Sequence, residues 1–292
     1  MSEAEPRHIW LCADDYGISP GVNAAICDLV RRRRINAVSA MVVAPSFSHR
    51  EAAALVDAAT PSQAIGLHLT LTAPFRPLSH GFAPLRHGAF LSLAATLQRT
   101  HLRRFEPELL TIEIVRQVEA FTAAFGRAPD FVDGHQHVQL LPQIGVALLR
   151  VVKDAAPDAW VRQCGRALPA HKRFADRKAL LLDGLSRRFR RIAARHGMRT
   201  NPAFAGAYAF RPHADYAKLF PEFLTSLPDG GVVMCHPGKV DAELRRLDPL
   251  TDLREREYEF FLDAAFPRLL AARGIALDTA PPASVALFDQ SA

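Results

Sequence analysis

Short apolar runs alternate with amphipathic segments along the whole chain. Most of the runs are apolar on both faces, which is typical of strands buried in a parallel sheet. The expected strands are Ile9–Ala13, Ala37–Val43, Ala64–Leu71, Phe131–His135, Trp160–Gln163 and Val232–His236, with Ile275–Asp278 as a further candidate.

The segments between these runs carry apolar residues at helical spacing. One helix is expected to begin at Ser19-Pro20, because serine is a good N-cap and proline suits the first helical position. A second is expected from about Glu108 to Phe125. A late helix is expected to carry Tyr258, Phe261, Ala265 and Leu269. Repeated strand–helix alternation predicts a parallel α/β sheet, and about seven units favour a closed or nearly closed, TIM-barrel-like (β/α) barrel.

The chain shows no internal repeat and no obvious linker. We expect residues 1–280 to form a single catalytic domain and residues 281–292 to form a C-terminal tail. The stretch Thr72–Ser92 is rich in Pro, Gly and His, which predicts a long loop. Loops of that length are usually functional or mobile.

The composition is that of a globular protein, with 49% hydrophobic and 23% charged residues in 292. The first residues lack a secretory signal, and no apolar stretch is long enough for a transmembrane segment, so a cytoplasmic location is expected. The four cysteines have no CxxC spacing, which excludes zinc-ribbon and thioredoxin sites and suits a reducing compartment. They are Cys12, Cys27, Cys164 and Cys235.

The net charge of +6 comes largely from arginine runs such as Arg31–Arg34 and Arg187–Arg191. We interpret these runs as solvated helix faces, and around 178–196 the apolar residues at helical spacing are Leu181, Leu185, Phe189 and Ile192. No nucleic acid partner is expected, because no aromatic residues interleave the basic ones. Peripheral contact with anionic lipid and a homodimeric assembly stay open.

Adjacent carboxylates follow the first expected strand in the segment ADDYGIS. Two such groups are costly to bring together unless a cation lies between them. Asp15 could bind a divalent metal ion while Asp14 stays free as a base. The alternative is a turn that caps the helix starting near Ser19.

Histidines occupy two further strands. His68 lies in GLHLTLT, where a single histidine is more often a core residue than a ligand. His135 and His137 lie in DGHQHVQ and would point the same way on an extended strand. Both could bind one ion, or one could bind while the other contacts substrate. Asp133 could orient an imidazole from behind.

Two other strand ends carry candidate groups. His236 in MCHPG is a candidate general acid, or else it simply caps its strand. Arg162 could hold Asp14 ionised, grip a substrate oxygen, or form a surface salt bridge. All these residues follow expected parallel strands at their C-terminal ends, which is the edge where α/β proteins build active sites.

The residue types suit metal-assisted hydrolysis of an amide or ester. One carboxylate and two imidazoles leave open positions on a divalent ion, which can acidify bound water and polarise a carbonyl. Asp14 could then accept a proton, and His236 could donate one to a leaving amine. No Walker loop, GxGxxG fingerprint or nucleophile elbow is present.

Four segments in order resemble the YdjC-like family, which includes chito-oligosaccharide deacetylases and hopanoid-biosynthesis-associated deacetylases. They are ADDYGISPGVN, IGLHLTLT, FVDGHQHVQLLPQI and MCHPG, and they span residues 13–238. The resemblance implies a TIM-barrel-like fold and removal of an acetyl group from an N-acetylated sugar or glycolipid. It implies that Asp14 is the catalytic carboxylate, that His236 is the acid, and that the metal ligands are Asp15, His68 and His135.

The metal of the family is often magnesium, whereas the ligand set itself suits zinc, manganese or cobalt at least as well. Tyr16 stands where the family often has Phe, at the expected wall of the substrate pocket. Gln139 replaces a common histidine, which puts the sugar preference in question. Two alternatives are a non-catalytic sugar- or metal-binding barrel and a metal hydrolase of another amide, such as a lipid-linked one.

Overall fold

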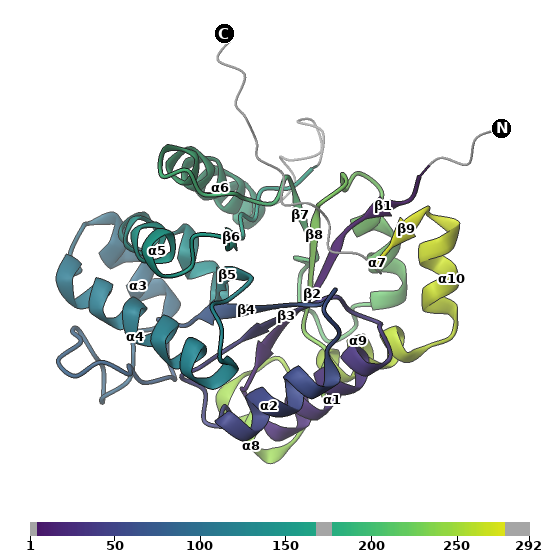
Figure 1. The fold of residues 1–292 in the computed structure, drawn as a ribbon, viewed down its shortest axis with the longest axis horizontal. Helices are drawn as coiled ribbons and strands as arrows, with labels where there is room; N and C mark the ends of the chain where they lie inside the picture. Colours follow the sequence, from purple (N-terminus) through teal and green to yellow (C-terminus); the bar gives the residue numbers. More distant parts are fainter. Residues whose placement is uncertain (1–4, 168–176, 278–292) are drawn as a thin grey trace, which may run out of the picture.

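A sheet of seven parallel strands forms the centre of the computed structural model, which describes residues 5–167 and 177–277 (Figure 1). The strand order is β6-β5-β4-β3-β2-β8-β7. The strands are β2 (Trp10–Tyr16), β3 (Ala37–Ala40), β4 (Ala64–Leu69), β5 (Phe131–Gly134), β6 (Trp160–Val161), β7 (Phe204–Ala205) and β8 (Val232–Cys235). Almost every strand residue is buried, as expected for runs that are apolar on both faces of the strand.

The two edges of this sheet meet. Single bridges join Val161 to Thr200 and Arg166 to Phe204, both in the parallel sense. The amide of Phe204 also donates to the carbonyl oxygen of Gly165 at 3.0 Å. The sheet therefore curls into a nearly closed barrel, which confirms the predicted fold class.

Helices pack around the barrel (Figure 1). The first, α1 (Pro20–Arg31), begins as expected, with the Ser19 hydroxyl accepting from the Val22 amide. The others are α2 (His49–Ala58), α3 (Leu93–His101), α4 (Pro107–Phe125), α5 (Pro142–Ala155), α6 (Arg177–Arg195), α7 (Tyr216–Leu224), α8 (Ala242–Leu247), α9 (Asp252–Leu262) and α10 (Ala265–Ala272). None of the helices in the described ranges is long and apolar enough to cross a membrane.

The C-terminal third differs from the prediction. The last expected strand is β9 (Ile275–Ala276), which pairs with β1 (Arg7–His8) in a separate sheet and is not part of the barrel. The expected late helix is two helices, α9 and α10. The chain leaves the helical conformation at Asp263, whose carboxylate accepts from the Ala265 amide at 2.6 Å and so competes with a continuous helix. The expected tail at 281–292 lies outside the described residues.

The arginine-rich helix α6 supports the interpretation of its charges as solvated. Arg187, Arg188 and Arg191 are exposed, while Phe189 is buried. Leu185, Phe189 and Ile192 pack against the core as expected, whereas Leu181 is 51% exposed. Asp183, Ser186 and Ala193 are also buried on this helix.

Candidate functional site

The register of the sheet brings the chemistry-bearing residues to one edge. Neighbouring strands from β2 to β5 are aligned so that their C-terminal ends lie side by side. His68 on β4 is the direct partner of Asp133 on β5. Side chains of such partners leave the sheet on the same face, so this register places the imidazole against the carboxylate.

An irregularity in β2 directs both adjacent carboxylates into the site. Neighbouring residues on a regular strand point to opposite faces. In β2 the register shifts between Ala13 and Tyr16, and Asp15 has a φ of 67°, in the left-handed region. This bulge turns Asp15 so that it and Asp14 both end in the same buried cluster. Strained backbone of this kind is concentrated at functional sites.

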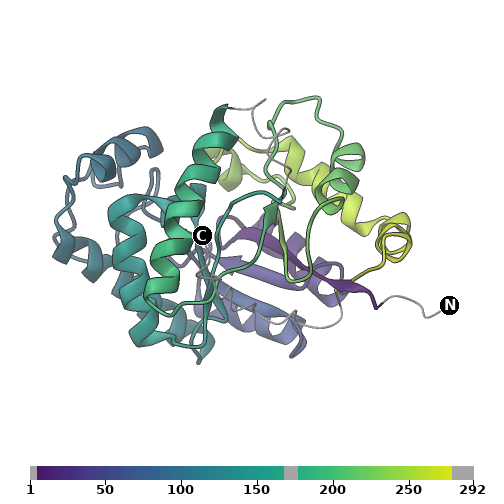
Figure 2. The ribbon, with the colours of Figure 1, turned by 90° about the horizontal axis from the view of Figure 1, so that it is seen from above.

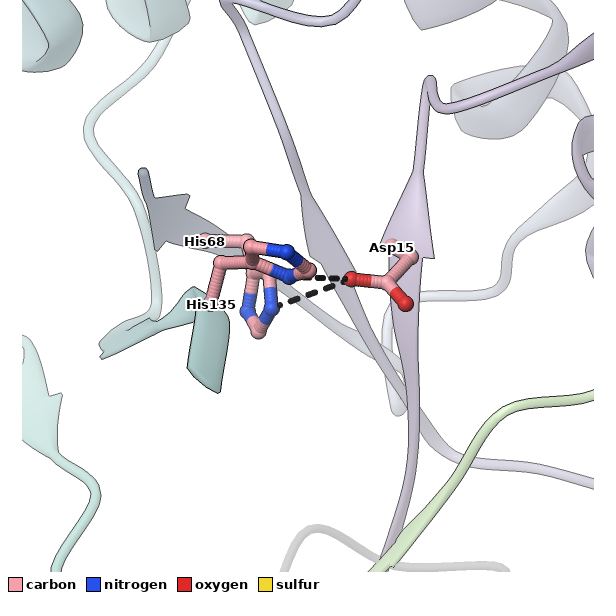
Figure 3. A group of neighbouring side chains, drawn as sticks. All are labelled: Asp15, His68 and His135. Atoms are coloured by element: carbon pink, nitrogen blue, oxygen red, sulfur yellow. Dashed lines mark hydrogen bonds and ion pairs between the residues drawn. The ribbon is translucent and has the colours of Figure 1, made fainter. Parts of the chain in front are cut away.

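Asp15, His68 and His135 form the centre of the site (Figure 3). One carboxylate oxygen of Asp15 lies 3.3 Å from Nε2 of His68 and 3.0 Å from Nδ1 of His135. A ligand atom from each of the three residues lies within 4.8 Å of the other two. The convergence expected from sequence is therefore present. Mixed oxygen and imidazole donors at this spacing could hold a divalent metal ion.

A second layer holds the His68 ring in place. Its Nδ1 lies 2.6 Å from Asp133 and 3.0 Å from the Ser39 hydroxyl, which also donates to Asp133 at 2.5 Å. Burial lowers the pKa of His68, but the carboxylates of Asp133 and Asp14 outweigh it and raise the pKa to about 10. The ring is therefore oriented through Nδ1, and its Nε2 faces Asp15.

Arg254 is a site residue that the sequence analysis missed. It lies on α9, is completely buried, and pairs with the outer oxygen of Asp15 and with Asp248, both at 2.6 Å. Burial opposes ionisation of Asp15, but the Arg254 guanidinium and the neighbouring histidines keep the pKa of that carboxyl well below its usual range. Nothing in the sequence around LREREYEF distinguishes this arginine from its exposed neighbours.

Arg162 holds Asp14 ionised, one of the three roles that the sequence left open. Its two terminal nitrogens contact the two oxygens of Asp14 at 2.7 and 2.6 Å. The guanidinium also pairs with Asp133 and contacts Cys12. Its positive charge therefore compensates the negative charges of Asp14 and Asp133. Burial would raise the pKa of Asp14, but Arg162 lowers it to about 2. Arg162 is fully buried, which contradicts a surface salt bridge, while its predicted grip on a substrate oxygen stays a prediction.

His137 and Tyr16 lie differently from the prediction. The chain leaves the extended conformation after Gly134, and Gln136 and His137 have φ values of 54° and 60°. The His137 ring stands edge-on to Phe204, and its Nδ1 lies 3.5 Å from the Cys164 thiol. Burial lowers the pKa of His137 to about 3. His137 is therefore not part of the group formed by Asp15, His68 and His135, and its contact with substrate stays a prediction.

Tyr16 is buried beneath the site and not in a pocket wall. Its hydroxyl donates to the carbonyl oxygen of Glu51 at 2.7 Å, on the side of α2. The side chain has no exposed surface, and its contact with substrate stays a prediction. Gln139 is likewise buried, and its amide donates to the Arg162 carbonyl.

His236 follows β8 at the edge expected from sequence. Its backbone amide donates to Glu257 on α9 at 2.5 Å. Its Nδ1 is buried and has no hydrogen-bond partner among the described residues. Burial lowers the pKa of His236 below its ordinary value of 6.5, so the ring is neutral at pH 7 in the free protein.

The predicted loop at Thr72–Ser92 reaches the site, and with α3 it projects from the side of the barrel (Figure 2). Phe75 stands edge-on to His135, with ring centroids 5.6 Å apart. Buried Glu113 on α4 accepts from the backbone amides of Leu78 and Ser79 and so anchors the loop. The signal for this anchor was a charged residue on the apolar face of α4, where Ile114 and Val118 are also buried.

Most of this chain is similar to proteins of one known family. Residues 8–272 match the model of a family described as YdjC-like protein. Proteins named chitooligosaccharide deacetylase from Yersinia pestis (strain Pestoides F) and Yersinia pseudotuberculosis (serotype O:3, strain YPIII) are each 28% identical over 237 residues, 80% of this chain and 82% of theirs.

Two solved structures share the fold. One is a protein from Enterococcus faecalis V583 named for cellobiose-phosphate cleavage, with a TM-score of 0.69 and 20% identity over 94% of this chain and 98% of that one. The other is a lactam utilization protein from Thermus thermophilus, with a TM-score of 0.50 and 15% identity over 94% and 99% of the two chains. Because the family match covers most of the sequence, this chain belongs to the YdjC-like family.

Proposed function

We propose that this protein hydrolyses the acetamido group of an N-acetylated sugar with the help of a bound divalent metal ion. The observation that carries the proposal is the cluster of Asp15, His68 and His135 beside a separate, permanently ionised carboxylate, Asp14. The substrate class is inferred from relatives that are named chitooligosaccharide deacetylases and align over most of this chain.

The side chains present fit a metal ion. Asp15, His68 and His135 would be its ligands, Ser39 and Asp133 orient one imidazole from behind, and Arg254 fixes the second oxygen of Asp15. Three protein ligands leave coordination positions for water and substrate. A cation bound there would act as a Lewis acid on the acetyl carbonyl and would acidify a water molecule. Magnesium, zinc, manganese and cobalt are all candidates for this donor set.

The surroundings of Asp14 and His236 support the roles that we propose for them. Asp14 would accept a proton from the attacking water as the new C–O bond forms. A carboxyl group with a pKa of about 2 holds a proton weakly, so Asp14 would pass it on rather than keep it. His236, neutral in the free protein, would take up that proton and donate it to the sugar nitrogen as the C–N bond breaks. Water is consumed, and acetate and a free amine are formed.

Metal uptake is expected to expel a proton from His68. With a pKa of about 10 the metal-free ring is protonated at pH 7, and a ligand nitrogen must be free of its proton. Apparent affinity should therefore rise with pH, by up to about tenfold per unit below pH 10. Calorimetry in buffers of different ionisation enthalpy would measure close to one proton released per metal ion. Asp133→Asn should reduce this release, and pH-independent affinity would contradict the assignment.

Acetate release is the direct test of the function. Metal-loaded protein should release acetate from diacetylchitobiose, and removal of metal by a chelator should abolish release until metal is restored. His68→Ala should lose both tight metal binding and activity, whereas exposed His49→Ala on α2 should change neither. Activity that survives complete metal removal would refute the metal-dependent mechanism.

Acetate release from a panel of soluble and lipid-linked acetamido sugars separates two alternative functions, a non-catalytic binding barrel and a hydrolase of lipid-linked amides. A binding module without catalysis would show negligible turnover in both the wild type and Asp14→Asn. A hydrolase of lipid-linked amides would prefer an acetamido sugar on a lipid carrier to the free oligosaccharide. The absence of that preference would favour the soluble sugar.

A further inference from the structure

The segment between β7 and α7 is held tightly against the strand that leads to His236. It begins at Gly206, which has a φ of 97°. A Cβ atom at this position would lie 2.1 Å from the carbonyl oxygen of Met234 in β8, so a larger residue has no room. The segment 206–215 therefore leaves the barrel directly beside the end of β8.

A single buried carboxylate ties this segment to the site. One oxygen of Glu257 accepts from the Tyr208 hydroxyl at 2.7 Å. The other accepts from the backbone amide of His236 at 2.5 Å. Glu257 lies on α9 and is almost completely buried, so the positions of Tyr208 and His236 are fixed relative to each other.

Phe210 is presented by this tethered segment. Its side chain is 43% exposed, and its ring lies 4.3 Å from the Tyr208 ring and 5.7 Å from the His236 ring, centroid to centroid. Phe210 is the one aromatic residue among the large hydrophobic residues found exposed in the described ranges, and its ring contacts a candidate catalytic side chain. An exposed apolar residue alone needs no explanation. This one adjoins the His236 imidazole, whose buried Nδ1 has no hydrogen-bond partner in the part of the chain that the structure describes.

A flat aromatic face beside a polar group is suited to a pyranose ring, which has an apolar C–H face and a polar rim. We propose that Phe210, positioned by Tyr208 and Glu257, is a stacking platform for the sugar ring whose nitrogen leaves, with His236 at the edge of that ring. The inference rests on the proposed function and adds the subsite that would select a sugar over other amides. Tyr208 and Glu257 act through Phe210 and His236 and are positioning residues.

Binding of the product tests the platform without requiring turnover. The probe is chitobiose, the fully deacetylated disaccharide, titrated into metal-loaded protein by calorimetry. Phe210→Ala should weaken binding by about tenfold, the scale of one aromatic contact, whereas Phe210→Trp should stay within about threefold of the wild type. Tyr208→Phe keeps the ring but loses the tether, and should weaken binding by a few-fold. Ile112→Ala, a similarly exposed apolar residue on α4, should have no effect.

Activity on diacetylchitobiose separates this inference from the proposed function. If the platform is correct, Phe210→Ala raises KM by about the same factor as the product Kd and changes kcat less. Normal binding and turnover in Phe210→Ala would overturn the platform and leave the deacetylase standing. If binding depends on Phe210 but no acetate is released, the platform stands and the proposed deacetylase activity is refuted. Wild-type protein that binds no chitobiose at millimolar concentration would also overturn the platform.

Discussion

Turnover of diacetylchitobiose is expected to fall by about a hundredfold to ten-thousandfold in Asp14→Asn. Asparagine has nearly the same shape and keeps an oxygen for Arg162, but it cannot accept a proton from water. Asp15, His68 and His135 are unchanged, so metal should still bind. Initial rates of acetate release and metal content by mass spectrometry would measure the two effects separately.

The matched control for this variant is Asp57→Asn, which removes an exposed carboxylate on the outer helix α2. It should leave both turnover and metal content unchanged. If Asp14→Asn retained full activity, Asp14 would not be the base. If it lost metal as well as activity, the separation between base and ligands would be wrong.

Replacing Arg162 with methionine is expected to lower the free energy of unfolding of the metal-free protein by about 3–5 kcal/mol. The guanidinium is completely buried between Asp14 and Asp133, and methionine would leave these two carboxylates facing each other without it. Urea denaturation monitored by circular dichroism would measure the change. Arg116→Met breaks an exposed ion pair with Glu119 and should cost less than about 1 kcal/mol.

A double variant makes this prediction sharper. Asp14→Asn combined with Arg162→Met removes one of the uncompensated carboxylates, so its loss of stability should be smaller than the sum of the single losses. Arg162→Lys keeps the charge without the two-pronged contact and should fall between the wild type and methionine. Additive losses would show that Asp14 and Arg162 are not energetically coupled.

The fold and the centre of the site followed from sequence because they depend on repeated local patterns. Runs that are apolar on both faces indicated buried strands, and parallel strands must bring their C-terminal ends to one edge of the sheet. That rule predicted that the strand-end residues would gather at one edge, and the family resemblance singled out Asp15, His68 and His135 among them. The strand β7 escaped notice because two residues carry no periodicity.

The rest of the site depends on long-range contacts that leave no local trace. Arg254 acts on Asp15 from 239 positions away in the sequence. The pairing of His135 and His137 on one ion required extended backbone, whereas Gln136 and His137 have left-handed backbone and His137 lies outside the metal group. Tyr16 turned away because the bulge at Asp15 changes which way the next side chain points.

The joint between β6 and β7 bears on how such barrels evolve. These strands are joined by isolated bridges and a few hydrogen bonds, not by a continuous ladder, and Arg162, on one side of the joint, reaches across the interior to Asp14 on β2. Asp14 would then act in the reaction and, through Arg162, also help to hold the barrel closed from inside. A descendant that abandoned catalysis would still be under selection to keep it, so an intact aspartate at position 14 is weaker proof of activity than intact histidines at 68 and 135.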